Sequence, residues 1–353
     1  MNKRRAQRPR VLEEIGEWGW LERLGRSLPR RAGQVVVGFG DDAACLALPS
    51  APGKLLLLTT DVLVEGTHFT WQTATPATLG EKAVAVNVSD IAAMGGRPKA
   101  MVVGVGAPAH FEIARLRAVF HAMKKTCQRW GIALVGGDTV RSERFILAPT
   151  LLGEFEGPAK RLPLRNRLRE GQNIYVTGTL GDSAAGLALL LGAKRTRGRL
   201  PASACRRLVE RHCRPRPLVD EGYVLTRHFD DLAMMDLSDD LWTTVGLMSR
   251  AGNVGMTIHL DRLPRSRALL EYCRATKRDP FELLVYGGED YGLLFTTFAD
   301  PISVEKVLRR AGLQTPVAAI GVVGGRGVRW MDDHGKSVVM KWKPFEHFAE
   351  GRR

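Results

Sequence analysis

The segment KLLLLTTDVLVEGTHF (residues 54–69) joins an apolar run to a polar turn that contains a glycine. Its first half, four leucines followed by two threonines and Asp61, is typical of a buried β-strand that ends in a ligand-binding loop. Glycine in such a turn lets the backbone and a carboxylate approach one ligand together. The segment therefore predicts an α/β protein whose strands end in binding loops.

Five further segments of the same kind occur along the chain: GFGDDAA (38–44), NVSDIAAMGG (87–96), VGGDT (135–139), MDLSDDL (235–241) and YGGEDYG (286–292). Each one alone is compatible with an ordinary turn or a helix N-cap. Together they gather more negative charge than turns require. Hard cations that carry a polyphosphate explain the pattern, because Mg²⁺ takes one or two carboxylates per ion and completes its shell with water and substrate phosphates.

Strands and helices alternate around these turns. Residues 78–94 are rich in alanine with apolar residues at helical spacing, and GGRP ends the predicted helix. The other predicted elements are a strand at 100–108, an amphipathic helix at 111–131, and strand-to-helix passages at 174–191 and 233–252. Between the helix at 111–131 and these passages come two apolar runs, IALVGGDTV and FILAPTLLGEF, with a turn between them.

The basic, proline-containing stretch near 157–171 is the predicted linker between two domains. We expect a basic arm with a leading helix at 1–35, an N-terminal domain at 36–157 and a C-terminal α/β domain at 158–353. A length of 353 residues allows each domain its own core.

Composition narrows the class of protein. No apolar stretch reaches the length that spans a bilayer. The basic start MNKRRAQRPR is not followed by the apolar core of a secretory signal. Five scattered cysteines without a C-x-x-C pair indicate neither a disulfide framework nor a zinc site. We expect a reducing, cytoplasmic location and no membrane partner.

The net charge of +15 comes from 52 basic and 37 acidic residues, and much of it lies in the N-terminal arm, at 160–169 and at 194–216. Such runs are usually solvated surface. No aromatic residues interleave with the arginines, as a groove for single strands requires. Nucleic acid is therefore expected only through non-specific contact, although a nucleotide-sensing, nucleic-acid-associated dimer without catalysis stays an alternative.

Taken in order, GFGDDA, TTDVLVEGTHF, AVNVSDIAAMG, VGGDT, YVTGTLGDSAAGLAL, MDLSDDL and GGEDYGLLFT resemble the thiamine-monophosphate kinases of the aminoimidazole-ribonucleotide-synthetase-like superfamily. The resemblance runs from about Val36 to WKPFEHF near the C-terminus. It implies a two-domain α/β (α+β) fold whose N-terminal sheet pairs with its copy in a homodimer. It also implies ATP-dependent phosphorylation of thiamine monophosphate to thiamine diphosphate, with several Mg²⁺ ions and ATP as co-substrate.

The resemblance also implies roles for particular residues. The implied metal ligands are Asp41, Thr59, Thr60, Asp61, Asp90, Asp138, Asp236 and Asp239; the implied ATP contacts are Gly137, Asp138, Arg165 and Ser238. His68, Glu289 and Phe345 are implied to bind thiamine monophosphate. The acceptor is itself a phosphate and needs little deprotonation, so we expect direct transfer with no protein nucleophile or base.

The chain departs from the family pattern at two positions. Asp240 replaces the glycine of the usual S-D-G-L, and Gly292 replaces the glutamate of GGEDYE. Asp240 either caps a helix or crowds the nucleotide. Two related enzyme types are less consistent with the sequence: a selenophosphate synthetase would carry a reactive cysteine before Cys45, and a hydrogenase-maturation protein would carry one after Cys273. An aminoimidazole-ribonucleotide-synthetase type stays open.

Overall fold

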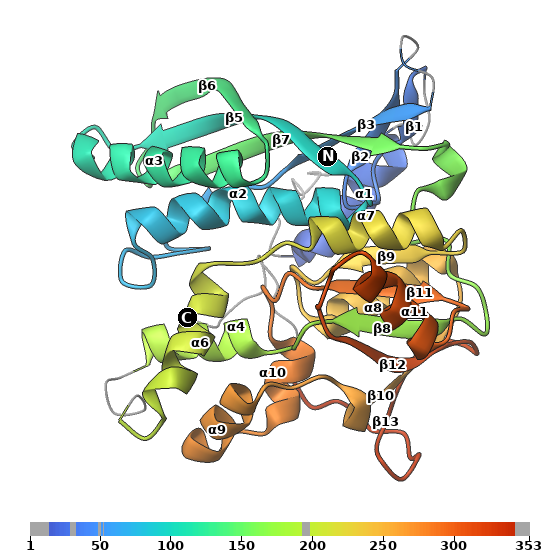
Figure 1. Cartoon of the computed structure of the whole chain (residues 1–353). Coiled ribbons are helices and arrows are strands. Elements are labelled where there is room, and N and C mark those ends of the chain that lie inside the picture. The colour runs from blue at the N-terminus through green and yellow to red at the C-terminus, as the bar shows by residue number, and fades with distance from the viewer. Residues whose placement is uncertain (1–13, 29–32, 49–50, 52, 193–197, 343–353) are drawn as a thin grey trace, which may run out of the picture.

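The computed structural model describes residues 14–28, 33–48, 51, 53–192 and 198–342. The basic arm at 1–13, part of the basic stretch at 194–216, and Phe345 lie outside the described residues. The rest folds into two mixed sheets with helices, one sheet in each half of the chain (Figure 1).

The first sheet has the strand order β1-β2-β3-β7-β5-β6, and the short β4 pairs with β7. Its neighbours are antiparallel except β5 and β6, which run parallel. The strands are β1 (Val35–Val37), β2 (Ala44–Ala47), β3 (Lys54–Thr60), β4 (Leu63–Val64), β5 (Arg97–Ala107), β6 (Ala133–Arg141) and β7 (Ile146–Glu156). The quoted leucine run is thus β3, as the sequence predicts.

Helices α2 (Pro76–Ala93) and α3 (Ile113–Arg129) cover one face of this sheet, and α1 (Gly16–Ser27) precedes it. Burial alternates along β3, so Leu55 and Leu57 enter the core while Leu58 points to the other face. A reciprocal capping box between Thr75 and Thr78 fixes the start of α2.

In the part of the chain that the structure describes, no helix covers the opposite face of the first sheet (top of Figure 1). Two apolar side chains of its central strands are exposed there, Leu58 at 41% and Val102 at 42%.

The second sheet has the order β13-β10-β12-β8-β11-β9, with only β10 and β13 parallel. Its strands are β8 (Asn173–Thr177), β9 (Ala233–Asp236), β10 (Met256–His259), β11 (Leu293–Thr297), β12 (Val317–Val323) and β13 (Val328–Met331). One core packs α7 (Val219–His228) and α11 (Pro301–Arg310) against this sheet. A larger core on its other side includes α4 (Asp182–Leu191), α6 (Ala202–Cys213), α8 (Leu241–Gly252), α9 (Arg267–Thr276) and α10 (Pro280–Tyr286).

Helix α2 lies between the two halves and contacts both. It packs on the first sheet, while its C-terminal end meets α7. A side chain at Gly222 of α7 would collide with the carbonyl of Ala92, so glycine is what allows this close approach. The predicted helices at 78–94 and 111–131 and the strand-to-helix passages at 174–191 and 233–252 are confirmed.

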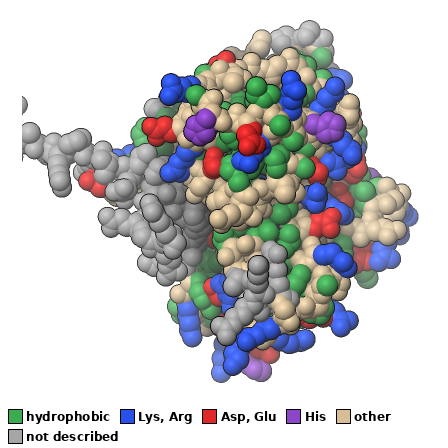
Figure 2. All heavy atoms as spheres, turned by 90° about the vertical axis from the view of Figure 1, so that its left-hand side faces the viewer, with side chains coloured by type: hydrophobic (Ala, Val, Ile, Leu, Met, Phe, Trp, Pro, Cys, Tyr) green, Lys and Arg blue, Asp and Glu red, His purple; other side chains and the backbone are tan. Residues whose placement is uncertain are grey.

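Among the described helices, none is long and apolar enough to cross a membrane. Figure 2 shows lysines and arginines spread over one side of the molecule with acidic residues among them. On that side, the basic excess is dispersed rather than gathered into a single groove.

Candidate functional site

The N-terminal half brings two aspartates to the junction between the sheets. Asp61 directly follows β3, and Asp90 lies in the last turns of α2. Their elements pack together, and the Thr59 hydroxyl donates a hydrogen bond to Asp90 Oδ2 at 2.5 Å. Thr60 faces the other way and donates to the Pro149 carbonyl at 2.9 Å. The alternation along β3 therefore separates two threonines that the resemblance placed together.

The C-terminal half contributes the segment after β9. Asp236 ends that strand and is buried, and Ser238 donates to Asp236 Oδ1 at 2.9 Å. Ser89 of α2 donates to the other oxygen, Oδ2, at 2.6 Å across the junction. Carboxylates from both halves thus meet beside α2.

Among the described residues these carboxylates have no ion-pair partner, although the charge of Arg165 lowers the pKa of Asp236 and of Asp239. Burial, with Asp236 and Asp239 nearby, raises the pKa of Asp61 to about 7. Burial, with Asp236, Asp240 and Glu17 nearby, raises the pKa of Asp239 to about 6. Burial, with Asp61, Asp236 and Asp42 nearby, raises the pKa of Asp90 well above its ordinary value. We call Asp61, Asp90, Asp236 and Asp239 the acidic cluster.

Arg165 joins the cluster to the loop after β1. Its Nη2 is 2.6 Å from Asp42 Oδ1, and its Nε is 3.5 Å from Asp41 Oδ1. Burial raises the pKa of both aspartates, and the arginine opposes that rise. The second carboxylate oxygen of Asp42, Oδ2, is buried and has no hydrogen-bond partner among the described residues.

The cluster fits hydrated cations better than a closed metal site. Within the described ranges, no three His, Cys, Asp or Glu side chains form a ready metal-binding group. Mg²⁺ does not require one, because it keeps several waters and takes one or two carboxylates together with substrate phosphates. Such ions could use two features of this site. One is Asp42 Oδ2, which has no hydrogen-bond partner among the described residues, and the other is the acidic cluster, which has no ion pair there.

Glu289 has an ionic environment of the opposite kind. Its Oε1 is 2.6 Å from Lys82 Nζ and its Oε2 is 3.2 Å from His212 Nδ1. Burial opposes ionisation of Glu289, but Lys82 and His212 outweigh it and lower the pKa to about 2. Ser183 Oγ lies 3.2 Å from the same His212 Nδ1. Because serine and glutamate meet one nitrogen, this group is not a nucleophilic triad, which needs both ring nitrogens.

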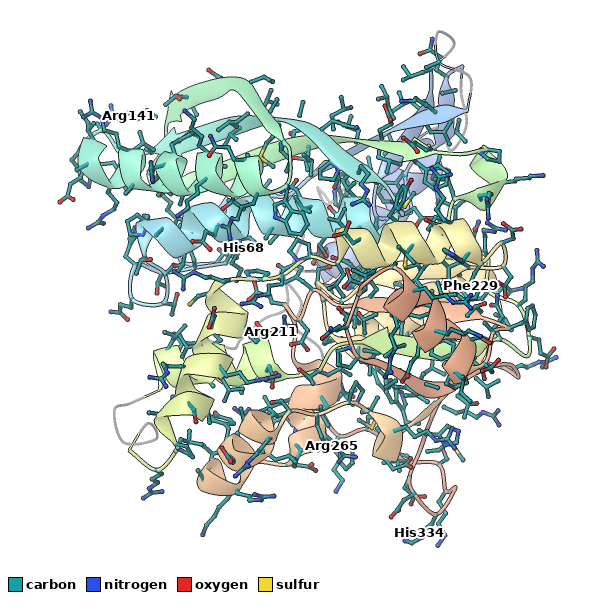
Figure 3. The ribbon with its side chains drawn as sticks, in the orientation of Figure 1. His68, Arg141, Arg211, Phe229, Arg265 and His334 are labelled. Carbon is teal, nitrogen blue, oxygen red and sulfur yellow. The ribbon has the colours of Figure 1, made fainter. Side chains whose placement is uncertain are left out.

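His68 lies on the turn after β4, beneath α2 and between the two halves (Figure 3). Its Nδ1 accepts a hydrogen bond from the Val64 N–H at 3.0 Å, which fixes the ring within its turn. Figure 3 also places Arg211 between the halves, below His68.

Gly137 and Asp138 lie apart from the acidic cluster in the same chain. Asp138 is exposed on β6, where its Oδ1 accepts from the Thr139 N–H at 2.8 Å. Strands β5 and β7 separate β6 from β3, a distance of roughly 14 Å at about 4.8 Å per strand. A side chain at Gly137 would collide with the Val103 carbonyl, so close strand pairing by itself accounts for this glycine.

Asp240 is the N-cap of α8. Its side chain accepts from the Thr243 N–H at 2.7 Å, and it is only 5% exposed. Of the two roles that the sequence left open, the structure shows the cap.

Sequence reasoning missed Asp42, Ser89, Lys82 and His212. Asp42 and Ser89 are next to the predicted ligands Asp41 and Asp90 in GFGDDA and NVSD. Their position in these motifs could therefore have indicated that they belong to the site. Lys82 and His212 stand outside the acidic motifs, and only the packing of α2 on α6 brings both to Glu289.

Comparison with known proteins places the chain in a family. Residues 40–155 match the AIR synthase related protein, N-terminal domain, and residues 169–331 match the AIR synthase related protein, C-terminal domain. A thiamine-monophosphate kinase of Aquifex aeolicus is 35% identical over 285 residues, covering 81% of this chain and 87% of the relative. One from Salmonella typhimurium is 33% identical over 345 residues, covering 95% and 98%.

Solved structures agree. The structure described as AaThiL complexed with AMPPCP and TMP is 32% identical, covers 97% of this chain and 100% of its own, and has a TM-score of 0.80. Hydrogenase maturation protein HypE in complex with ATP matches at 21% identity and a TM-score of 0.62, a likeness of fold alone. The chain belongs to the thiamine-monophosphate kinase family.

Proposed function

We infer that this protein is a thiamine-monophosphate kinase, which transfers the terminal phosphoryl group of ATP to thiamine monophosphate. Relatives that carry this name align with nearly the whole chain, and the structure matches one that holds an ATP analogue and TMP. The observation in this chain that carries the proposal is the acidic cluster, to which both halves contribute and in which burial and mutual repulsion raise the carboxylate pKa values.

The acidic cluster would hold Mg²⁺ ions between the nucleotide phosphates and the protein. Its four aspartates are the proposed ligands, with Asp41 and Thr59 at its edge; Thr60 and Asp138 stay predictions. Bound Mg²⁺ would neutralise the charge that develops on the transferred phosphoryl group. Ser238 and Arg165 are the proposed ATP contacts, and Arg165 would exchange part of its contact with Asp42 for phosphate oxygen.

The acceptor side of the site rests on His68 and Glu289. Lys82 and His212 lower the pKa of Glu289 to about 2, and 29% of its side-chain surface is exposed, so this anionic side chain would meet a cationic thiazolium or an aminopyrimidine. Phe345, predicted to contact the rings, lies outside the described residues. The reaction needs two anionic groups held in line, so positioning and charge neutralisation suffice without a protein nucleophile.

We also propose a homodimer that forms through the open face of the first sheet. Leu58 and Val102 give that face an apolar centre, and a second copy would remove it from water. This arrangement also gives Asp138 a role: it would reach the acidic cluster of the partner copy rather than its own.

A coupled assay for ADP release tests the function. With ATP, Mg²⁺ and thiamine monophosphate we expect turnover and thiamine diphosphate as product, with free thiamine and aminoimidazole precursors inactive. Turnover of an aminoimidazole substrate alone would assign the chain to another enzyme of the superfamily. Binding of ATP without turnover, together with salt-dependent retention on heparin, would favour the non-catalytic alternative.

Mixing two inactive variants tests the shared site. Asp138→Asn and Asp90→Asn, co-expressed, should recover about one quarter of the wild-type activity, because half of the randomly paired dimers then hold one intact site. If the mixture stays as inactive as each variant alone, Asp138 serves its own chain or no site at all.

A further inference from the structure

Lys82 is a buried cation that the acidic motifs do not include. It is 5% exposed and lies on α2, two turns before Asp90. A lysine is almost never buried so fully unless it is paired. Its partner at 2.6 Å is Glu289, which belongs to the other half of the molecule.

The backbone around Glu289 is fixed independently of Lys82. The Glu289 N–H donates to the Ser238 carbonyl at 2.8 Å, and the Tyr291 N–H donates to the Leu237 carbonyl at 2.8 Å. A third bond runs back from the Leu237 N–H to the Gly292 carbonyl at 2.9 Å. Loss of Lys82 would therefore leave this loop, and the Asp236 segment to which it is bonded, in place.

The side chain of Glu289, in contrast, is directed by its ionic partners. Glu289 has a left-handed backbone conformation, with φ at 63°, which points its side chain away from the path of an extended strand. Lys82 holds one carboxylate oxygen from the N-terminal half, and His212 of α6 holds the other from the C-terminal half. Each carboxylate oxygen therefore has its own ionic partner, and 29% of the side chain is still exposed.

We propose that Lys82, assisted by His212, is a positioning residue that aims the Glu289 carboxylate at the cationic part of the acceptor substrate. The proposal rests on the proposed role of Glu289 at the acceptor side. A carboxylate that is already ionised and fixed binds a cation without the entropy cost of ordering a free side chain. Lys82 itself touches neither the substrate nor the acidic cluster in this arrangement.

The test is Lys82→Met, which keeps the length of the side chain and removes its charge. We expect the KM for thiamine monophosphate to rise on the order of tenfold, because the carboxylate is no longer aimed. The KM for ATP and the Mg²⁺ concentration for half-maximal rate should stay within about twofold of wild type, since the backbone bonds to Leu237 and Ser238 remain. Lys82→Arg should recover much of the loss.

Lys306→Met is the matched control, because it removes the same charge from an exposed position of α11 in the C-terminal half. It should leave every kinetic constant unchanged. If Lys82→Met folds poorly, His212→Gln removes the second contact from the other half and should raise the same KM by about threefold. In a Glu289→Gln background, either change should add nothing to that KM.

A Lys82→Met enzyme with a lower melting temperature but an unchanged KM for thiamine monophosphate would overturn the proposal and make the pair purely structural. An equal rise in the KM for ATP or in the Mg²⁺ requirement would overturn it as well, because the change would then have reached the acidic cluster. Failure of the proposed function is a separate result, since it shows in the wild-type enzyme as absent turnover of thiamine monophosphate.

Discussion

Two sets of carboxylates meet at the same junction between domains and have opposite electrostatics. In the acidic cluster, burial and mutual repulsion raise the pKa values, to about 7 for Asp61 and about 6 for Asp239. At Glu289, Lys82 and His212 outweigh burial and lower the pKa to about 2. The difference is one of ion pairing. Glu289 has cationic partners within the protein, whereas the described residues provide no ion pair for the acidic cluster. The carboxylate that has its own lysine is the one we propose as a fixed anion, and the carboxylates that lack an ion-pair partner among the described residues are the ones we propose as metal ligands.

The largest expected effect is a loss of activity when a carboxylate of the acidic cluster is neutralised. Asp90→Asn should lower the rate by about three orders of magnitude, because it removes a ligand for charge neutralisation at the transferred group. The melting temperature of the metal-free variant should equal or exceed that of the wild type, because the substitution removes repulsion between Asp90 and the neighbouring carboxylates. Activity assays and thermal melts of one sample measure both quantities. Asp261→Asn, at an exposed position of the short helix η3 (Leu260–Arg262), is the control. Near-normal turnover of Asp90→Asn at ordinary Mg²⁺ would remove Asp90 from the site.

The second test measures how much the Glu289–Lys82 ion pair contributes to the stability of the protein. Glu289→Gln leaves the Lys82 ammonium buried without its counter-charge, so we expect a loss of about 2 kcal/mol in the free energy of unfolding. This is less than for a fully buried pair, because Glu289 is 29% exposed. The double variant Lys82→Met/Glu289→Gln should recover part of the loss. Chemical denaturation of the four proteins gives the coupling, and additive losses would mean that the pair does not interact.

A third test uses pH on the metal-free protein. The folded pKa values of Asp61 and Asp239 lie above the unfolded value of about 3.9, so the folded state binds more protons than the unfolded state between about pH 4 and 7. Stability from these groups is therefore present at low pH and lost as pH rises through 7. We expect Mg²⁺ to raise the melting temperature by a few degrees at pH 8 and by less at pH 5. An equal shift at both values would contradict a cation site at the cluster.

The smallest effect concerns the residue at the edge of the cluster. Asp240→Ala should cost about 1 kcal/mol through loss of the α8 cap, whereas Asp240→Asn keeps a capping oxygen and should cost little. Denaturation curves of both variants decide this. If asparagine destabilises as much as alanine, the charge of Asp240 matters more than its hydrogen bond to Thr243.

Much of the framework was predictable because it is local. The alternation of β3 and the stop at GGRP after α2 are set by short-range periodicity and backbone preference, which residues near in sequence determine. The family resemblance, rather than local periodicity, implied metal roles for Asp61, Asp90, Asp236 and Asp239. For Asp240 the sequence left two roles open. In the structure its side-chain oxygen accepts a hydrogen bond from the Thr243 N–H, which makes Asp240 the N-cap of α8.

The sequence by itself determined which residues carry charge, which elements hold them and which family pattern they follow. Only the tertiary structure decided how each charge is compensated. Arg165 meets Asp41 and Asp42 across more than 120 positions, and Lys82 meets Glu289 across more than 200, by their residue numbers. The same packing leaves Asp138 on an outer strand, away from the aspartates with which its motif groups it. Electrostatic energy depends on distance in space and on burial, and neither can be obtained from separation along the chain.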